Sequence, residues 1–288
     1  MTAIEWTEVT WNPVTGCDRI SAGCDNCYAL AMAKRLKGMG AEKYQRDGDP
    51  RTSGPGFGVT VHPAALDIPR RWRRPKLVFV NSMSDLFHAK VPAEFVRQVF
   101  DVMASTPQHT YQVLTKRPLR ARRMAEQGLE FPPNVWFGVS VENQDAADQR
   151  IPELNRIPAA VRFLSCEPLI GPVDLYDHLF PERCPDGCRC RWPDDGDAYE
   201  CACGGACSEW APSPALDWVI VGGESGPNVR PMHPNWVLDL RDQCVNAGAA
   251  FFFKQWGGRT PKQNGRILDG RTWDQMPTGH HLDAEARA

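Results

Sequence analysis

Short, nearly continuous apolar runs recur along the chain, and most are followed by a segment with helical periodicity, such as Phe95, Val96 and Val99. Runs of this kind are typical of strands buried on both faces of a parallel sheet. The alternation predicts strand–helix units joined by right-handed crossovers. The predicted strands are 8–11, 76–80, 111–115, 135–139, 162–165, 218–221 and 250–254, and the predicted helices are 28–36, 92–105, 145–156 and 235–247.

Six or seven such units favour an α/β fold built as a partial or full (β/α) barrel of parallel strands over an open doubly wound sheet. We expect one barrel-like domain over residues 1–277. Two segments interrupt the pattern: 38–69, predicted as an irregular Gly- and Pro-rich loop, and 176–215, predicted as a Cys-rich insertion. Residues 278–288 are predicted to form a polar C-terminal tail.

The composition fits a soluble globular protein, because 42% of the residues are hydrophobic and 24% are charged. The apolar runs are too short to cross a bilayer and the first residues lack a secretory signal, so we expect a cytoplasmic protein without membrane contact. A net charge of −2 argues against a globally basic nucleic-acid binder. Local basic runs at 70–74 and 116–123 are compatible with phosphate contacts, and equally with an ordinary solvated surface.

Three cysteines, Cys17, Cys24 and Cys27, lie close together after the first predicted strand. In a reducing compartment such a group indicates metal ligands or redox chemistry rather than disulfides. A closed structural zinc site needs a fourth protein ligand, here a distant histidine or cysteine, whereas an iron–sulfur cluster on three thiolates leaves one iron open. The position at the mouth of the predicted barrel favours the open cluster and therefore catalysis.

A second group of six cysteines lies inside the predicted insertion and forms a near-palindrome of spacing. A structural metal, zinc on four of the six thiols, is one interpretation, and an auxiliary iron–sulfur cluster is another; disulfides are the least favoured. The two cysteines outside both groups, Cys166 and Cys244, are predicted to be small buried hydrophobic residues. The six are Cys184, Cys188, Cys190, Cys201, Cys203 and Cys207.

Polar side chains follow each predicted strand, and the carboxyl ends of the strands line the active site in parallel barrels. Each of these residues alone is compatible with a plain loop, but together they predict one shared cavity. The glycines of the run 222–226 would let the backbone approach a ligand or would form a tight turn. The candidate binding residues are Asn81, Ser82, Ser84, Asp85, Lys116, Ser140, Glu142, Glu167 and Glu224.

Several segments carry a resemblance to a known family. The chain resembles the phage Gp37/Gp68-type three-Cys-motif proteins (DUF5131), and the placement of the three cysteines is similar to the radical S-adenosylmethionine (SAM) superfamily. The common radical SAM spacing is three residues and then two, whereas here it is six and then two. The segments that carry the resemblance are 11–17 with Cys24 and Cys27, 81–87, 114–118, 138–143, 165–168, 222–226 and 252–257.

The radical SAM resemblance implies a 4Fe–4S cluster on the three cysteines, with SAM bound to the fourth iron and cleaved reductively to a 5′-deoxyadenosyl radical. It also implies that the segment 81–85 lies near the SAM amino group, that Ser140 and Glu142 lie near the ribose, and that Lys116 lies near the carboxylate. The implied partners are an electron donor such as a flavodoxin or ferredoxin and a nucleic-acid or nucleotide substrate, the latter also suggested by the basic runs.

Two other functions are compatible with the sequence. The first is a non-catalytic, zinc-stabilised protein that binds nucleic acid or a partner, with zinc at both cysteine groups. The second is a hydrolase with Cys166 as nucleophile, which lacks a suitable histidine partner. The radical SAM-type enzyme is the leading hypothesis.

Overall fold

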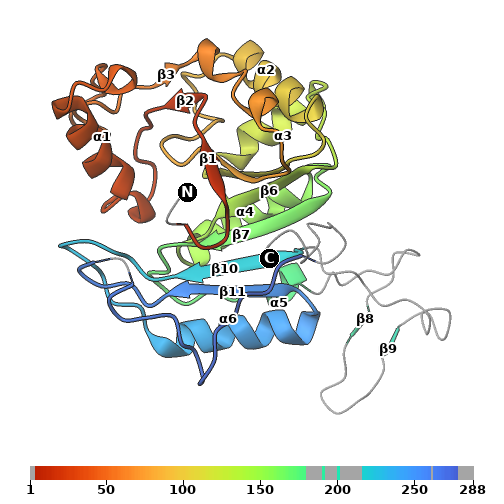
Figure 1. Ribbon diagram of the computed structural model, residues 1–288. Coiled ribbons are helices and arrows are strands. Elements are labelled where there is room, and N and C mark those ends of the chain that lie inside the picture. The colour runs from red at the N-terminus through yellow and green to blue at the C-terminus, as the bar shows by residue number, and fades with distance from the viewer. Residues whose placement is uncertain (1–3, 180–189, 192–199, 202–215, 261, 278–288) are drawn as a thin grey trace.

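A curled sheet of seven parallel strands forms the centre of the protein, in the order β1-β4-β5-β6-β7-β10-β11 (Figure 1). The computed structural model describes residues 4–179, 190–191, 200–201, 216–260 and 262–277. The two outer strands do not pair with each other, so the sheet is a half-barrel, and the prediction of a partial (β/α) barrel is confirmed. The strands are β1 (Val9–Trp11), β4 (Leu77–Val80), β5 (Thr110–Thr115), β6 (Val135–Ser140), β7 (Val161–Cys166), β10 (Trp218–Gly222) and β11 (Ala250–Gln255).

The helices follow the strands, as expected for repeated crossovers. Four of them match the predicted helices within two residues at each end, and α6 ends at Gly248, whose φ of +72° forms a left-handed cap. The helix α3 and the short helix α5 are additions to the prediction. The helices are α1 (Tyr28–Gly38), α2 (Ala93–Ala104), α3 (Pro118–Glu126), α4 (Gln144–Asn155), α5 (Tyr176–Leu179) and α6 (Pro234–Ala247).

The segment predicted as an irregular loop contains some regular structure. Strand β3 (Thr60–Val61) pairs antiparallel with β2 (Val14–Thr15), which ends two residues before the first cysteine. The remaining short elements are the 3₁₀ helices η1 (Ala22–Cys24), η2 (Glu42–Tyr44), η3 (Pro63–Ala65) and η4 (Pro69–Arg71), and the antiparallel pair β8 (Cys190–Arg191) and β9 (Glu200–Cys201).

The two faces of the sheet bury different sets of side chains, because successive residues of a strand point to opposite faces. The convex face packs against the helices through residues such as Val78 and Val99. The concave face carries a separate aromatic cluster, which Trp6 of the N-terminal segment covers with edge contacts to Phe79 and Trp218 at 4.7 and 6.2 Å between ring centroids. Apolar packing thus fills the concave face along the strands and leaves their carboxyl ends to polar residues.

Cys166 and Cys244 are fully buried in the convex-side core, as predicted. Of the six-cysteine group, Cys190 and Cys201 stand opposite each other in the β8–β9 pair, and Cys184, Cys188, Cys203 and Cys207 lie outside the described residues. Leu216, the first described residue after the insertion, lies two residues before β10, at the amino end of the sheet.

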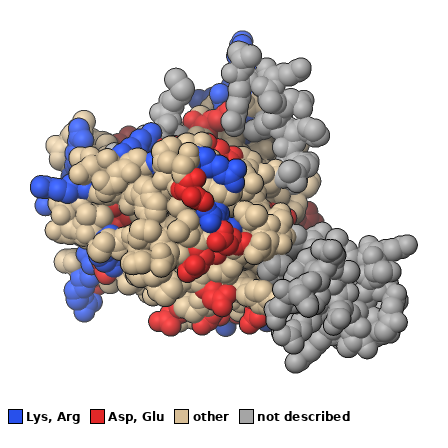
Figure 2. All heavy atoms as spheres, turned by 90° about the horizontal axis from the view of Figure 1, so that it is seen from below, with Lys and Arg blue, Asp and Glu red and all other residues tan. Residues whose placement is uncertain are grey.

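Positive and negative side chains are interspersed on the face shown in Figure 2. None of the helices in the described part of the chain is both long and apolar enough to span a membrane.

Candidate functional site

The three cysteines lie on one loop that connects β2 to α1, at the carboxyl ends of the strands. Cys17 follows β2, Cys24 ends η1, and Cys27 immediately precedes α1; all three are half-buried. Gly16 immediately precedes this loop, and its amide donates to the carbonyl of Met83 at 2.9 Å. A Cβ on Gly16 would lie 2.3 Å from the carbonyl oxygen of Gly58, so only glycine fits there. We call residues 17–27 the cysteine loop.

Arg117, in the turn after β5, connects the cysteine loop to the ends of two strands. Its Nη1 donates to Asp85 Oδ2 at 2.8 Å and to Cys17 Sγ at 3.4 Å, and its Nη2 donates to the carbonyl of Asp18 at 2.9 Å. Asp85 is itself buried and fixed by Thr115 Oγ1 at 2.7 Å and by the amide of Lys116 at 3.0 Å. The carboxylate of Asp85 therefore orients a guanidinium toward a thiol.

Asp18 fastens the same end of the loop from the opposite side. Its Oδ2 accepts from Lys90 Nζ at 2.8 Å and lies 3.1 Å from His88 Nε2, and its Oδ1 accepts from the hydroxyls of Thr52 and Ser53. Burial alone would raise the pKa of Asp18, but the hydrogen bonds from Lys90, Thr52 and Ser53 outweigh it and hold that pKa well below its usual range. Asp18 is therefore ionised at neutral pH.

Glu142, after β6, supports the middle of the loop through a buried ion pair. Arg150 on α4 donates to both of its carboxylate oxygens, at 2.7 and 3.2 Å. Burial would raise the pKa of Glu142, but the hydrogen bonds and charge of Arg150, together with Lys116 and a hydrogen bond from Ser21, lower it overall. A Cβ on Gly23 would lie only 3.0 Å from Glu142 Cδ, so the cysteine loop packs directly on this carboxylate.

Glu224, after β10, supports the last part of the loop. Arg230 Nη2 lies 2.6 Å from Glu224 Oε1 and also donates to the carbonyl of Ala22 at 2.9 Å. Asn26 Nδ2 donates to Glu224 Oε2 at 2.9 Å. Burial would raise the pKa of Glu224, but the hydrogen bonds from Arg230 and Asn26 lower it overall.

Glu167, after β7, pairs with a lysine on the concave face. Lys254 Nζ of β11 lies 2.9 Å from Glu167 Oε1, and the indole of Trp6 donates to Oε2 at 3.2 Å. Gly222 makes room for this carboxylate, since a Cβ there would lie 2.7 Å from Glu167 Oε1. The glycine at 222 therefore accommodates a side chain of the protein itself.

Each of the four candidate carboxylates thus has its own cation, and three of the pairs hold the cysteine loop. The charge of each carboxylate is therefore neutralised within the protein. Lys116 differs: no carboxylate lies within ion-pair distance of its ammonium group in the described part of the chain, although its charge acts on Cys27 and Glu142. Lys116 is therefore an uncompensated cation beside the cysteine loop.

The candidates at the end of β4 also fall into two groups: residues that bind other parts of the protein, and one residue without a hydrogen-bond partner in the described structure. Ser82 accepts a hydrogen bond from Asn12 at 3.0 Å, and Ser84 donates to the carbonyl of Val14 at 2.9 Å, so both hold the N-terminal segment. Asn81 is buried, and neither its oxygen nor its nitrogen has a hydrogen-bond partner among the described residues. Ser140, at the end of β6, is also buried, and its carbonyl accepts from Arg150 at 2.7 Å. Buried unpaired amides are rare in native proteins, which makes Asn81 the strongest candidate for a ligand contact in this segment.

The thiols are grouped but not arranged around one point. Within residues 4–179, 190–191, 200–201, 216–260 and 262–277, no three His, Cys, Asp or Glu side chains are placed to hold a metal ion as they stand. Burial and the nearby Asp85 raise the pKa of Cys17 to about 12, and Arg117 only partly opposes this. Burial also raises the pKa of Cys27. Without a metal, both thiols are therefore protonated at neutral pH.

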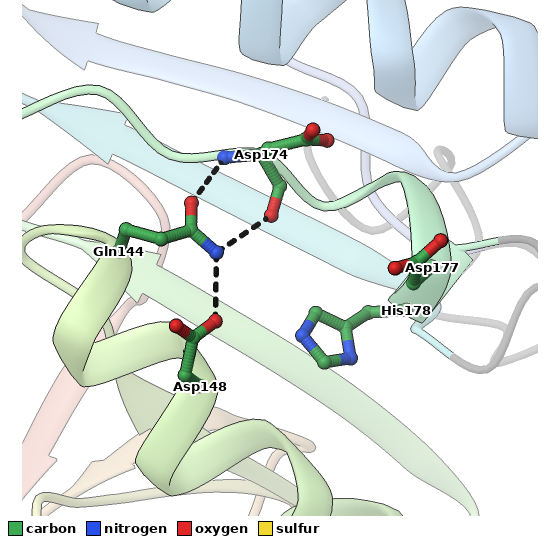
Figure 3. A pocket seen from close by; sticks show the side chains of 5 residues that line it. All are labelled: Gln144, Asp148, Asp174, Asp177 and His178. Atoms are coloured by element: carbon green, nitrogen blue, oxygen red, sulfur yellow. Dashed lines mark hydrogen bonds between the residues drawn. The ribbon is translucent and has the colours of Figure 1, made fainter.

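Surface hollows of the described structure include the following two. One, of about 410 Å³, is lined by Arg230, Met232 and Trp256 among others, so it borders the cysteine loop through the guanidinium that contacts Ala22. The other, of about 270 Å³, lies between α4 and α5 (Figure 3) and none of the candidate residues lines it. Its residues bond to one another: Gln144 Nε2 donates to Asp148 at 2.8 Å and to the carbonyl of Asp174 at 3.2 Å.

Several residues that shape the site lie outside the predicted set of binding residues. Arg117, Arg150 and Lys254 are the cations of three of the pairs, and Asp18 anchors the loop. Arg117 and Lys254 are among the polar residues at the ends of predicted strands, so their positions indicate that they face the site. Arg150 lies within a helix and carries no such signal.

Comparison with curated proteins and with solved structures found no match. The family model described as a protein of unknown function (DUF5131) matches residues 1–277. The chain therefore belongs to the DUF5131 family.

Proposed function

We propose that this protein is a radical SAM-type enzyme in which Cys17, Cys24 and Cys27 hold a 4Fe–4S cluster. The observation that carries the proposal is the cysteine loop itself: three strand-end ion pairs fasten it, and the uncompensated Lys116 lies beside it. Such an arrangement fixes three thiols at the mouth of a half-barrel and leaves a positive charge for an anionic group of a ligand, such as a carboxylate.

The donor set fits a cluster with one open iron. Each thiolate of such a cluster binds a different iron, so the three sulfurs need not meet around one ion, and no fourth protein ligand is required. Zinc, in contrast, needs four donors around a single point. When bound and reduced, the cluster would supply the single electron that cleaves SAM.

The chain's own residues would bind and orient SAM. Lys116 offers its ammonium group to the SAM carboxylate in a charge-assisted hydrogen bond. Asn81 offers an amide oxygen that accepts from an ammonium group, as expected at the end of β4. Asp85, Glu142 and Glu224 act indirectly, since their carboxylates hold the loop.

A nucleic-acid-derived substrate is part of this proposal, but the basic runs support it less than their sequence suggests. Residues 70–74 precede β4, at the amino end of the sheet and away from the cysteine loop. In the other run, Arg120 donates to two backbone carbonyls, and Arg122 pairs with Glu126 and Glu153. The support for an anionic group on the substrate or cofactor therefore rests on Lys116.

Anaerobic reconstitution with iron and sulfide tests the proposal. We expect a brown protein that produces 5′-deoxyadenosine from SAM when reduced. Alanine at Cys17, Cys24 or Cys27 should abolish both properties, whereas Cys166→Ala, in the convex-side core, should keep them. A colourless protein that binds zinc, or a loaded and reduced cluster that leaves SAM intact, would contradict the proposal, and the former would favour the zinc-stabilised binding protein.

The same preparations address the second cysteine group, for which we propose zinc or an auxiliary cluster. Metal that remains after replacement of the first three cysteines must be bound elsewhere. Its identity, and its loss in Cys184→Ala, would assign it to the insertion.

A further inference from the structure

Arg117 is the one guanidinium that donates to a cysteine sulfur in the described part of the chain. Its Nη1 lies 3.4 Å from Cys17 Sγ, a normal separation for a hydrogen bond to sulfur. The side chain is 15% exposed, so water competes little for these donors. The contact is therefore a defined feature of the loop.

Several groups fix the direction of this donor. Asp85 binds the same Nη1 at 2.8 Å, and the carbonyl of Asp18 binds Nη2 at 2.9 Å. Asp85 is held in turn by Thr115 at 2.7 Å. A planar guanidinium has donors at fixed angles, which lets it satisfy all three partners at once; a lysine ammonium on a flexible stem does not reproduce this.

We propose that Arg117 is a positioning residue that raises the reduction potential of the centre held by Cys17, by donating an N–H to its sulfur. The inference rests on the proposed function, because it assigns to the cysteine loop a redox centre. A cluster becomes more negative when it is reduced, so a cation and an N–H donor at the sulfur stabilise the reduced form more than the oxidised form. Hydrogen bonds to cluster sulfurs are among the factors that set these potentials.

The geometry also explains why Asp85 is next to the thiol. On its own this buried carboxylate would repel a thiolate, and it does raise the pKa of Cys17. Paired with Arg117 it instead aims the guanidinium at the sulfur. The pair therefore presents the guanidinium to Cys17 as its hydrogen-bond donor.

Potentiometric titration of the anaerobically reconstituted protein, followed by electron paramagnetic resonance, tests this inference. We expect Arg117→Met to retain iron and to have a more negative midpoint potential than the wild type. Arg117→Lys, which keeps the charge but lacks the fork of donors, should lie between the two. Arg122→Met, on helix α3 directly after Arg117 but paired with Glu126 and Glu153, is the matched control and should have the wild-type potential.

Each outcome decides between alternatives. Equal potentials in Arg117→Met and wild type, at equal iron content, would overturn the inference. If Arg117→Met does not retain iron, Arg117→Lys decides, and a wild-type potential there overturns it as well. Loss of iron from both variants would show that Arg117 is needed to fold the loop, and would overturn the inference that it sets the potential through the Cys17 sulfur. A wild type that assembles no cluster would instead contradict the proposed function.

Discussion

Arg230 joins Glu224 to the cysteine loop, from which both residues are about two hundred positions away in the chain. Its Nη2 lies 2.6 Å from Glu224 Oε1 and donates to the carbonyl of Ala22 at 2.9 Å, while Nη1 lies 3.4 Å from Asp25 Oδ2. One guanidinium therefore connects the end of β10 to the residues on both sides of Cys24. The loop's position at the strand ends depends on such long-range contacts.

Arg230→Met should loosen the cysteine loop. The variant leaves the buried carboxylate of Glu224 without its cation and the carbonyl of Ala22 without its donor. We expect the free energy of unfolding to fall by about 1–3 kcal/mol, since Arg230 is partly exposed. Hydrogen exchange should become faster at residues 21–26 in particular. Arg259→Met, at an exposed position beyond β11, should change stability by less than about 0.5 kcal/mol. Hydrogen exchange at residues 21–26 that is no faster in Arg230→Met than in Arg259→Met would contradict this role.

The Glu142–Arg150 pair is the most deeply buried of the four, with side chains 2% and 9% exposed. Arg150→Met leaves a buried carboxylate without compensation, which costs about 3–5 kcal/mol. The double variant Glu142→Gln/Arg150→Met removes both charges and should lose less stability than Arg150→Met alone. Urea denaturation of the two variants and the wild type measures the difference. A double variant that is less stable than Arg150→Met would contradict this, because it would show that the Glu142 carboxylate stabilises the fold even without Arg150.

Acid should weaken the hold on the cysteine loop. The pKa values of Glu142 and Glu224 are lower in the folded protein than in the unfolded chain, because Arg150 and Arg230 outweigh the effect of burial. Each carboxylate therefore contributes stability above its unfolded pKa of about 4.3, and this contribution is lost as pH falls toward the folded value. The stability difference between wild type and Glu142→Gln should consequently shrink below about pH 4. Urea midpoints measured from pH 7 downward test this. A stability difference that grows as the pH falls would contradict a lowered pKa of Glu142 in the folded protein.

The strands are predictable from sequence because burial on both faces makes them continuous apolar runs. The run at 135–139 predicts β6 to within one residue. Helix α3 escapes prediction because it buries only Pro118, Ala121 and Met124 among several arginines. Such a short apolar stripe is hard to separate from a solvated loop.

The location of the site is predictable from the sequence, but which acidic residue pairs with which basic residue is not. Polar strand ends predict convergence, and Asn26 meets Glu224 across 198 residues of sequence. Nothing in the spacing indicates that Glu142 takes Arg150, or that Glu167 takes Lys254, because such pairs depend on the curl of the sheet. The carboxylates therefore look like ligand contacts in the sequence and act as supports in the fold.

Lys116 lies beside the cysteine loop and pairs with no carboxylate among the residues that the structure describes. A charge-assisted hydrogen bond contributes about 1.5–3 kcal/mol, so Lys116→Ala should weaken SAM binding to the reconstituted protein by about tenfold or more. Lys116→Arg, which keeps the charge, should lose less. Isothermal titration calorimetry with SAM measures both. Lys76→Ala, at the amino end of β4, removes an equal charge from the opposite end of the sheet and should bind SAM as the wild type does. Wild-type affinity in Lys116→Ala would mean that this ammonium group serves another ligand or none.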